Sequence, residues 1–423
     1  MTEAGGARRS VAALGHVNFR RYFAGQLLST VGTWMQLTAQ IWLVLEITDS
    51  GRALGLASAL QFIPALVLGA WAGVMADRVD NRLLLFATNA GAMTLAFGLW
   101  GLSATGHLSI GWLYVAAFAI GVGNAFDRAA GPAFVTSLVD EEHLSSAIGL
   151  YSVTTSASRM VGIAAGGIVI TAFGPSVCFF VNGVSYVIVL VSLVSLRSSE
   201  IAERRVHGAP VRIRDALSHV HTQPVLFRTL VTTFVVGMFC FNFQILVPAM
   251  VKLGFHADAS WFGFAEVFSG AGSTLAGFVV GTMRRPTVRT VSLAAIALGV
   301  ATVLAGVAPY LVLFCGLMFA VGVTATGYMT VSMTVVQSSA APEMRGRVSA
   351  LLVMANQGTT PIGALIMGFM IGFVGVRSTM VFAGASALVA GVVLLVLEAR
   401  RTSDITVGGR DEVVGRLDPA SSS

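Results

Sequence analysis

The chain has 423 residues, of which 55% are hydrophobic and only 11% are charged, and its mean hydropathy is +0.81. A soluble chain of this length and composition would leave large apolar patches facing water, so the composition indicates a membrane protein. The formal net charge of +6 requires no nucleic-acid partner, because basic residues concentrated on one side of a membrane account for it.

Twelve apolar runs are each long enough to cross a bilayer core about 30 Å thick as a helix. In chain order they cover residues 20–47, 54–76, 83–104, 110–136, 146–172, 176–196, 225–251, 259–283, 288–307, 310–337, 346–373 and 377–398. A polar stretch over 197–224 separates the sixth run from the seventh. The sequence therefore predicts an all-α membrane protein of twelve transmembrane helices. We expect an N-terminal tail (1–19), a six-helix bundle (20–196), a central loop (197–224), a second six-helix bundle (225–399) and a C-terminal tail (400–423).

The basic residues predict how the chain is oriented in a cell membrane. Of the 26 Lys and Arg, only Arg52, Lys252 and Arg377 fall in loops on one side, and Arg128 and Arg159 fall within runs. The others lie in the tails, the central loop, the even-numbered loops or the borders of these regions. By the positive-inside rule those regions are cytoplasmic, and both termini with them.

An internal repeat supports the division into two bundles. The stretch "AFAIGVG" from Ala117 resembles "MFAVGVT" from Met318, an offset of 201 residues. The same offset aligns "EEHLSSAIGL", which ends at Leu150, with "PEMRGRVSAL", which ends at Leu351. Two homologous bundles would enclose a path between them.

Three stretches of the sequence resemble the major facilitator superfamily. "GVMADRVDNR", residues 73–82, stands between the second and third runs and is similar to the loop signature of that superfamily. "NFRRYFAGQLLSTVGTWM" at the start of the first run and "GTTPIGALIMG" in the eleventh resemble its drug-efflux branch, which includes macrolide exporters and enterobactin-type siderophore exporters. The resemblance runs from about Asn18 to Arg401 and implies a secondary transporter.

The resemblance also implies a conformational latch in the loop after the second helix. The residues that match the signature are Gly73, Asp77, Arg78 and Arg82, with Asp80 where a second glycine is usual. The glycine would let two helices approach, and the aspartate would accept hydrogen bonds across the bundles in one state and release them in the other. The alternative is a plain turn with solvated charges. The corresponding stretch of the second half, "GFVVGTMRRPTVR", keeps glycine and arginines but has no aspartate.

Polar residues within the runs are candidates for a substrate cavity. In the first run, polar residues at spacings of four, three and four share one helical face. The resemblance implies that the first, fourth, seventh and tenth helices surround the path. The candidate cavity residues are Thr33, Gln36, Gln40, Asn124, Asn242, Gln244 and Tyr328. The alternative is hydrogen bonding between neighbouring helices. Aromatic residues in the first, seventh and eighth runs favour a bulky, partly apolar substrate.

Ionisable residues within the runs are candidates for proton coupling, since an unpaired charge in the membrane is costly. Asp127 and Arg159 lie in consecutive helices, so they could pair; the alternative to a coupling role is that such a pair is structural and holds the first bundle together. Glu266 has no evident ionic partner in the sequence, and isolation in an apolar setting favours the protonated carboxyl. The sequence therefore predicts that Glu266, Asp127 and Arg159 take part in proton exchange.

Small residues in the fifth and eleventh runs predict close helix packing. "SRMVGIAAGG" resembles an antiporter motif at Gly162, Gly166 and Gly167, but Ile163 stands in place of the motif's proline. The eleventh run keeps a proline. There Pro361 stands among Gly358, Gly363 and Gly368, and we expect a bend at this point.

Other chemistries are disfavoured by the residues present. The chain has one lysine, Lys252, which is not in a phosphate-binding loop, so ATP hydrolysis is not expected. The seven histidines form no HExxH pattern, and His219 with His221 lie in the central loop, so we expect neither a metal site nor a cofactor. The three cysteines fall in apolar runs, where packing is the expected role. The sequence does not predict an enzyme.

The sequence therefore predicts a monomeric secondary transporter that exports a bulky, amphipathic, drug-like compound by alternating access, in exchange for protons. Its partners would be the small-molecule substrate, protons and the lipid bilayer, with no nucleic acid. The alternatives are a specific metabolite or siderophore exporter or permease without proton antiport, and a non-transporting membrane sensor.

Overall fold

The computed structural model describes residues 12–197, 213–281 and 286–415, and every regular element in this part of the chain is a helix. The first half contains η1 (Ala12–Gly15), α2 (Val17–Thr48), α3 (Gly51–Arg78), α4 (Asn81–Ala104), α5 (Ile110–Ser137), η2 (Glu141–His143), α6 (Leu144–Phe173) and α7 (Pro175–Val194). The second half contains α8 (Ile213–Thr222), α9 (Pro224–Phe239), α10 (Phe243–Ala249), the π-helical turn η4 (Met250–Gly254), α11 (Ala259–Gly281), α12 (Val288–Val307), α13 (Leu311–Ser339), η5 (Pro342–Met344), α14 (Arg345–Gln357), α15 (Thr360–Val374) and α16 (Val376–Gly415).

Each of the twelve predicted spans has a helical counterpart in the structure. Eleven helical segments of the described residues are long and apolar enough to cross a membrane. The twelfth counterpart is α2, which has 32 residues and packs along α6 and α7. Its hydropathy is lower because it carries several polar side chains, including Gln36 and Gln40. The predicted all-α membrane fold is confirmed.

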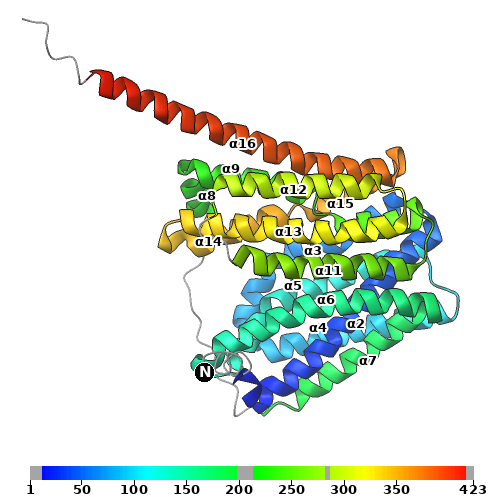
Figure 1. Cartoon of the computed structure of the whole chain (residues 1–423). Helices are drawn as coiled ribbons and strands as arrows, with labels where there is room; N and C mark the ends of the chain where they lie inside the picture. The colour runs from blue at the N-terminus through cyan, green and yellow to red at the C-terminus, as the bar shows by residue number, and fades with distance from the viewer. Residues whose placement is uncertain (1–11, 198–212, 282–285, 416–423) are drawn as a thin grey trace, which may run out of the picture.

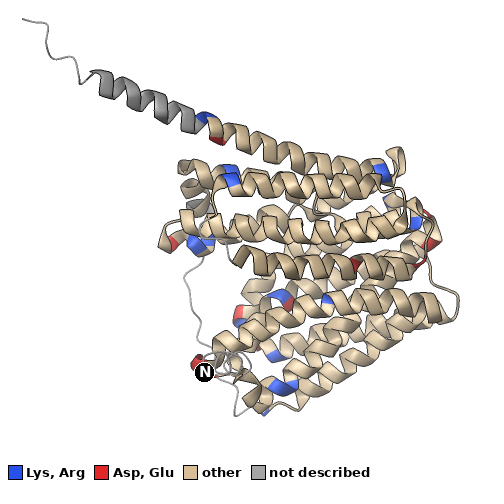
Figure 2. Ribbon diagram, viewed as in Figure 1, with Lys and Arg blue, Asp and Glu red and all other residues tan. Residues whose placement is uncertain are grey.

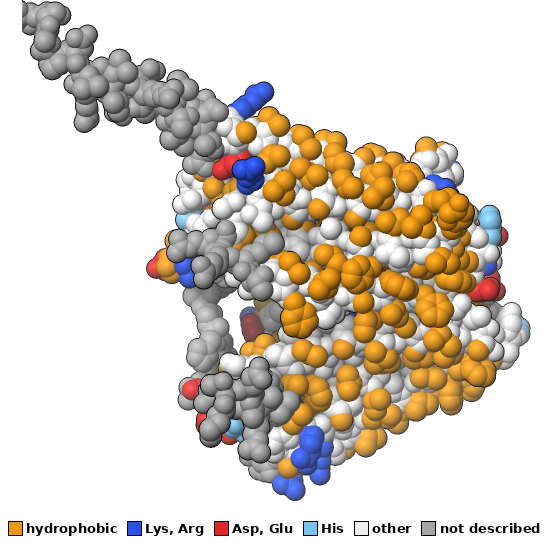
Figure 3. All heavy atoms as spheres, viewed as in Figure 1, with side chains coloured by type: hydrophobic (Ala, Val, Ile, Leu, Met, Phe, Trp, Pro, Cys, Tyr) orange, Lys and Arg blue, Asp and Glu red, His pale blue; other side chains and the backbone are white. Residues whose placement is uncertain are grey.

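The helices form two bundles that lie one above the other in Figure 1, α2–α7 below and α9–α16 above. Both halves of the chain begin and end at the left of this view. We call that side the basic end, because its described residues include Arg20, Arg21, Arg78, Arg82, Arg197, Arg228, Arg289, Arg345, Arg347 and Arg400. Charged residues lie mainly at the two ends of the bundles in Figure 2, and hydrophobic side chains cover the flank between them in Figure 3. Such an apolar flank suits a lipid environment.

The tails and the central loop are described only in part. Residues 1–11 and 416–423 of the predicted tails lie outside the described residues. The same is true of residues 198–212 of the central loop and of residues 282–285, which include the arginine pair of the second-half loop. Within the predicted central loop, α8 forms a short helix whose Ala216 and Val220 are buried against the second bundle.

The internal repeat is visible in matching helix starts. Gly174 precedes α7 with φ +86°, and Gly375 precedes α16 with φ +81°. Both positions need a backbone conformation that glycine adopts without steric cost. They are separated by the 201-residue offset found in the sequence. The last helix of each bundle therefore begins after the same kind of glycine turn.

Two of the predicted spans are broken helices. The seventh span, predicted over 225–251, is confirmed by the helical segment Pro224–Gly254, but its interruption was not predicted: α9 ends at Phe239 and α10 begins at Phe243. The eleventh is divided into α14 and α15 around Gly358 and Thr359, just before Pro361. A proline has no N–H to donate and disfavours helical geometry in the residue before it, so the predicted bend has a direct cause.

The hydrophobic cores show that the two bundles meet at one end only. At the end opposite the basic end, buried residues of both bundles form a single cluster, which includes Leu45, Leu54, Ile245, Phe262 and Met367. At the basic end each bundle has its own core, around Phe134 in the first, and around Tyr328 and Val348 in the second. Figure 3 shows the surface hollowed between the two halves at the basic end. The structure is therefore closed at one end and open at the other.

Candidate functional site

Glycines bring the two bundles into backbone contact at the closed end. A Cβ atom on Gly55 of α3 would lie 2.7 Å from the carbonyl oxygen of Ala364 and 2.8 Å from the Cα of Gly368, both on α15. A Cβ atom on Gly167 of α6 would lie 2.5 Å from the carbonyl oxygen of Ala259, where α11 begins. Only glycine permits this approach, so the α3–α15 and α6–α11 contacts depend on it.

Two cation–π contacts cross from one bundle to the other at the same end. The guanidinium carbon of Arg52 lies 4.3 Å from the ring centre of Phe373. The Nζ atom of Lys252 lies 5.1 Å from the ring of Trp42. In each pair one residue belongs to the first bundle and the other to the second. We call Arg52, Phe373, Trp42 and Lys252 the closed gate.

An ion pair joins the bundles through α6 and α11. Arg159 donates from Nη2 to Oε2 of Glu266 over 3.2 Å, and the Arg159 guanidinium lies 5.6 Å from the ring of Trp34. The Glu266 side chain is 7% exposed, whereas that of Arg159 is 47% exposed. Arg159 therefore presents a partly accessible cation, and a buried carboxylate holds it from the other bundle.

This pairing corrects two predictions made from the sequence. Asp127 was the candidate partner of Arg159, and Glu266 was expected to have no ionic partner. The sequence places α5 next to α6 in chain order, which suggested the first pair. Arg159 instead pairs with Glu266 because α6 packs against α11, although the two residues are 107 positions apart in the chain.

Asp127 lies inside the first bundle. It accepts a hydrogen bond from the hydroxyl of Thr88, which joins α5 to α4. Together with Asn124 and Tyr186 it lines a pocket of about 620 Å³ between these helices, and every residue lining this pocket belongs to the first bundle. Asp127 and Asn124 therefore lie near one another on the wall of a pocket within the first bundle.

The polar face of α2 is covered by α7. The Thr33 hydroxyl lies 3.0 Å from that of Tyr186, and Gln36 accepts a 2.7 Å hydrogen bond from the side-chain amide of Asn182. Gln40 is buried, and its Nε2 atom has no hydrogen-bond partner among the described residues. In this conformation Gln36 and Gln40 are buried and Thr33 is half-buried, so their role as cavity residues stays a prediction. Thr33 and Gln36 form hydrogen bonds with a neighbouring helix, which was the alternative. Periodicity shows that residues share a helix face, but it does not show which helix covers that face.

The candidate cavity residues of the second bundle are also largely enclosed. Tyr328 is fully buried, and its hydroxyl lies 3.0 Å from that of Thr233. Asn242 is buried at the break between α9 and α10, where its side-chain amide donates to the carbonyl of Met238. Gln244 is partly buried. Tyr328 and Asn242 therefore stabilise the second bundle here rather than line a cavity.

The residues of the predicted latch lie at the basic end of the first bundle. Arg82 donates to the carbonyls of Leu193 and Val194 over 2.9 and 3.2 Å, so it stabilises the C-terminal end of α7. Asp77 and Arg78 are exposed at the end of α3. No described atom lies within 4 Å of a Cβ built on Gly73, so the close helix approach expected there is absent from this open arrangement.

The packing glycines contact three different neighbours. A Cβ on Gly162 would lie 2.6 Å from the carbonyl of Val31, and one on Gly166 would lie 3.1 Å from Cβ of Thr38, so both pack against α2. Gly167 contacts α11 across the bundles, as described above. Gly363 lies against the carbonyl of Met238 on α9. At Gly358 the nearest atom is the carbonyl of Met354 in its own helix, so this glycine serves the helix break and not a helix contact.

A second polar contact crosses between the bundles. Arg128 of α5 donates from Nη1 to Oε1 of Gln357, the last residue of α14, over 3.1 Å. Both side chains are exposed. Arg128 is therefore an accessible cation that reaches from the first bundle to the second. In the sequence Arg128 lies within a predicted span and has no evident role, because nothing in the chain order points to Gln357.

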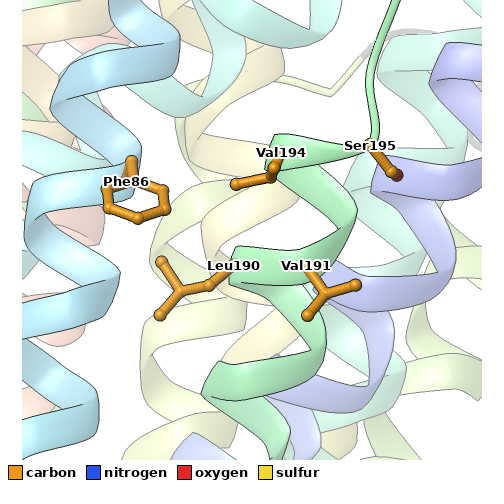
Figure 4. A pocket seen from close by; sticks show the side chains of 5 residues that line it. All are labelled: Phe86, Leu190, Val191, Val194 and Ser195. Atoms are coloured by element: carbon orange, nitrogen blue, oxygen red, sulfur yellow. The ribbon is translucent and has the colours of Figure 1, made fainter.

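A separate apolar pocket of about 390 Å³ lies between α4 and α7 and is shown in Figure 4. It is lined by Phe86, Leu190, Val191, Val194 and Ser195. The hydroxyl of Ser195 already donates to the carbonyl of Ser192. With no other polar side chain in its lining, this pocket offers no group for recognition or chemistry and suits contact with lipid.

Two helix bundles that meet at one end and part at the other have the architecture of a membrane transporter. The chain belongs to a family of the major facilitator superfamily, the transmembrane secretion effectors, whose model matches residues 9–414. The resemblance found in the sequence is thus confirmed.

Curated relatives cover most of the chain at low identity. The staphyloferrin A transporter of Staphylococcus aureus is 21% identical over 87% of this chain and 93% of its own length. Macrolide efflux protein A of Streptococcus pyogenes is 21% identical over 92% of this chain and 98% of its own. The multidrug efflux pump Tap of Mycobacterium tuberculosis is 24% identical over 90% of this chain and 93% of its own length.

The fold is shared with solved transporters. The nucleoside transporter NupG superposes with a TM-score of 0.70 at 11% identity, covering 90% of this chain and 98% of that structure. At this identity the likeness concerns the fold alone.

Proposed function

We propose that the chain exports a bulky, partly apolar compound by alternating access, in exchange for protons, and that it acts as a monomer. The observation that carries the proposal is the Arg159–Glu266 ion pair, because it joins the two bundles that must separate when the closed end opens. A carboxylate placed there has a different environment in each state of the cycle.

The orientation of the chain supports export. By the positive-inside rule the basic end faces the cytoplasm, so both termini are cytoplasmic and the hollow between the bundles opens inward. A substrate can then enter from the cytoplasm while the closed gate seals the outside. The relatives described as macrolide and multidrug efflux proteins support this direction and a bulky substrate.

Proton exchange follows from what happens to Glu266 when the bundles separate. While α6 and α11 are in contact, Arg159 stabilises the ionised carboxylate of Glu266. Separation of the two helices at the outer end removes this partner, and an unpaired carboxylate in the membrane interior favours binding a proton from the outside. When the pair forms again, Arg159 displaces that proton toward the cytoplasm. One proton thus moves inward for each return to the inward-open state.

The position of Asp127 makes it the weaker candidate for coupling. Its hydrogen bond to Thr88 lies within the first bundle, which moves as one body in a rocking motion. Its surroundings therefore change less between the two states than those of Glu266.

The test is substrate-dependent proton movement in liposomes that contain the purified protein and a pH-sensitive dye, with lipophilic cations, macrolides and siderophores as substrates. Wild type, Glu266→Gln and Asp127→Asn are compared with Glu398→Gln. The last is a matched control, since Glu398 pairs with Arg228 over 3.4 Å within the second bundle. Loss of proton movement in Glu266→Gln alone supports the proposal. Substrate transport without proton movement in wild type contradicts antiport.

A second candidate function is export of a specific acidic metabolite, such as a carboxylate-bearing siderophore, without proton antiport. The observation that favours it is Arg128, an exposed cation that spans the space between the bundles. The staphyloferrin A transporter among the relatives agrees with this candidate. In the same liposomes, Arg128→Gln would abolish siderophore movement while macrolide movement, if any, continues. Equal movement in Arg128→Gln and wild type contradicts this candidate.

A further inference from the structure

Three side chains that commonly bind metal ions gather at the basic end of the first bundle. They are His16, at the start of α2, and Asp140 and His143, in the loop between α5 and α6. One ligand atom from each lies within 4.8 Å of the others. His16 and His143 are 127 residues apart in the chain, which explains why the sequence pattern predicted no metal site.

The backbone holds these ligands in place. The His16 N–H donates to the carbonyl of Ala13 over 3.1 Å, and Ala13 is fully buried with its own N–H bonded to Ser146 at the start of α6. In the loop, the His143 N–H donates to the carbonyl of Asp140 over 3.0 Å. Both histidines therefore stand on backbone that is fixed before any ion arrives.

The distances between the ligand atoms are compatible with a bound cation as well as with a hydrogen bond. The Nε2 atom of His16 lies 3.2 Å from Nδ1 of His143 and 3.8 Å from Oδ2 of Asp140. The first distance also permits a hydrogen bond, but the second is too long for one. Metal bonds of about 2.0–2.2 Å in tetrahedral geometry separate neighbouring ligand atoms by roughly 3.3–3.6 Å. Both observed distances lie within a few tenths of an ångström of that range.

We propose that His16, Asp140 and His143 form a binding site for a divalent transition-metal ion, of which Zn²⁺ is the best match. Two imidazoles and one carboxylate favour Zn²⁺, Co²⁺, Ni²⁺ or Cu²⁺ over Mg²⁺ and Ca²⁺, which prefer oxygen ligands. The Asp140 side chain is 81% exposed, so solvent reaches the site and water supplies the remaining coordination. Glu141 and Glu142 follow directly in the chain and add negative charge nearby.

A bound ion would fasten the start of α2 to the start of α6. These two helices pack along each other, and α6 also forms the contact with α11 in the second bundle. Because an ion that binds the folded protein and not the unfolded chain stabilises the fold, occupancy raises the thermal midpoint. The site is distinct from the path between the bundles and does not depend on the proposed transport activity.

The experiment uses the full chain, purified through a tag without histidine and treated with a chelator. Co²⁺ is added, and its visible absorption reports nitrogen and oxygen ligation; Zn²⁺ is then titrated in competition. Wild type is expected to bind one ion and to gain thermal stability with Zn²⁺ but not with Mg²⁺. His16→Ala and His143→Ala are each expected to weaken binding by on the order of 100-fold. His107→Ala is the matched control, because His107 is exposed at the other end of the bundle.

The variants are accepted only if their thermal midpoints without metal equal that of wild type, and Asp140→Asn supplies a third variant at an exposed position. If all variants bind Co²⁺ as wild type does, or if wild type shows neither absorption nor a Zn²⁺-dependent midpoint, the proposal is wrong and the two histidines are only hydrogen-bonded. Wild-type data alone decide this last point, so a misfolded variant does not obscure the result.

Discussion

Arg159 and Glu266 face one another across the two bundles, with 3.2 Å between Nη2 and Oε2. The carboxylate is buried and the guanidinium is about half exposed. Under the proposed proton antiport, this charge pair links the protonation of Glu266 to the separation of the two bundles.

Removing the charge of Arg159 alone and removing both charges of the pair are expected to have different consequences. In Arg159→Ala the buried Glu266 loses its ionic partner, so we expect proton movement to fall at least tenfold. The double variant Arg159→Gln with Glu266→Gln leaves two neutral groups that can hydrogen-bond to each other. It is expected to be more stable to thermal unfolding than Arg159→Ala but not to move protons. Dye-loaded liposomes and thermal unfolding measure the two effects. Full proton coupling in the double variant would exclude the pair as the coupling site.

The pH dependence of the cycle follows with a definite sign. A proton on Glu266 removes the charge that holds Arg159, so acidification outside favours the separated, outward-open state. In wild type, export is expected to become faster as the external solution is made more acidic. In Glu266→Gln, the export rate is expected not to depend on external pH. Initial rates at a series of external pH values check this. A wild-type rate that does not change with the gradient would contradict proton coupling.

The closed gate is expected to loosen when its cations are removed. Each cation–π contact contributes about 0.5–1 kcal/mol at an accessible site, so Arg52→Ala with Lys252→Ala raises the open population about 5- to 30-fold. Arg377→Ala is the matched control, because Arg377 lies 4.7 Å from the ring of Phe255 within the second bundle. The measurement is the alkylation rate of a cysteine introduced in the path, with reagent added from outside. Equal rates in the double variant and the control would rule out a gating role.

The glycine contact between α3 and α15 predicts a conformational effect of added volume. In Gly55→Val the new side chain meets the backbone of Ala364 and Gly368, so the closed outer end is disfavoured and export is expected to fall at least tenfold. Gly69→Val on the same helix is the control, since no described atom lies within 4 Å of a Cβ there. Transport rate and outside accessibility are measured together. If Gly69→Val is equally inactive, the effect of Gly55→Val reflects helix α3 itself and not the contact.

The hydrogen bond between Gln36 and Asn182 predicts a stability effect without a direct substrate effect. A double-mutant cycle with Gln36→Leu and Asn182→Leu is expected to give a coupling free energy of about 0.5–1.5 kcal/mol. Unfolding in detergent measures it, and substrate affinity of the folded variants is expected to stay within about threefold of wild type. A coupling free energy near zero together with a loss of substrate affinity would indicate that Gln36 lines the substrate cavity.

Part of the candidate site was accessible from the sequence because the bilayer imposes simple rules. Helix length, apolar composition and the 201-residue repeat predicted the spans and the division into two bundles. Pro361 predicted the bend in the eleventh span. The break at Cys240–Asn242 was missed, because no proline stands at that point.

The sequence by itself determined which residues lie in the membrane, how the halves correspond and which side chains carry charge there, since these depend on composition and local periodicity. Only the tertiary structure decided what each polar side chain contacts. A helix presents several faces, and its neighbours come from remote parts of the chain. Gln36 therefore meets Asn182 of α7, Arg159 meets Glu266 instead of Asp127, and His16 meets His143. These contacts depend on how the helices pack against each other. The spacing of residues along the chain does not carry that information.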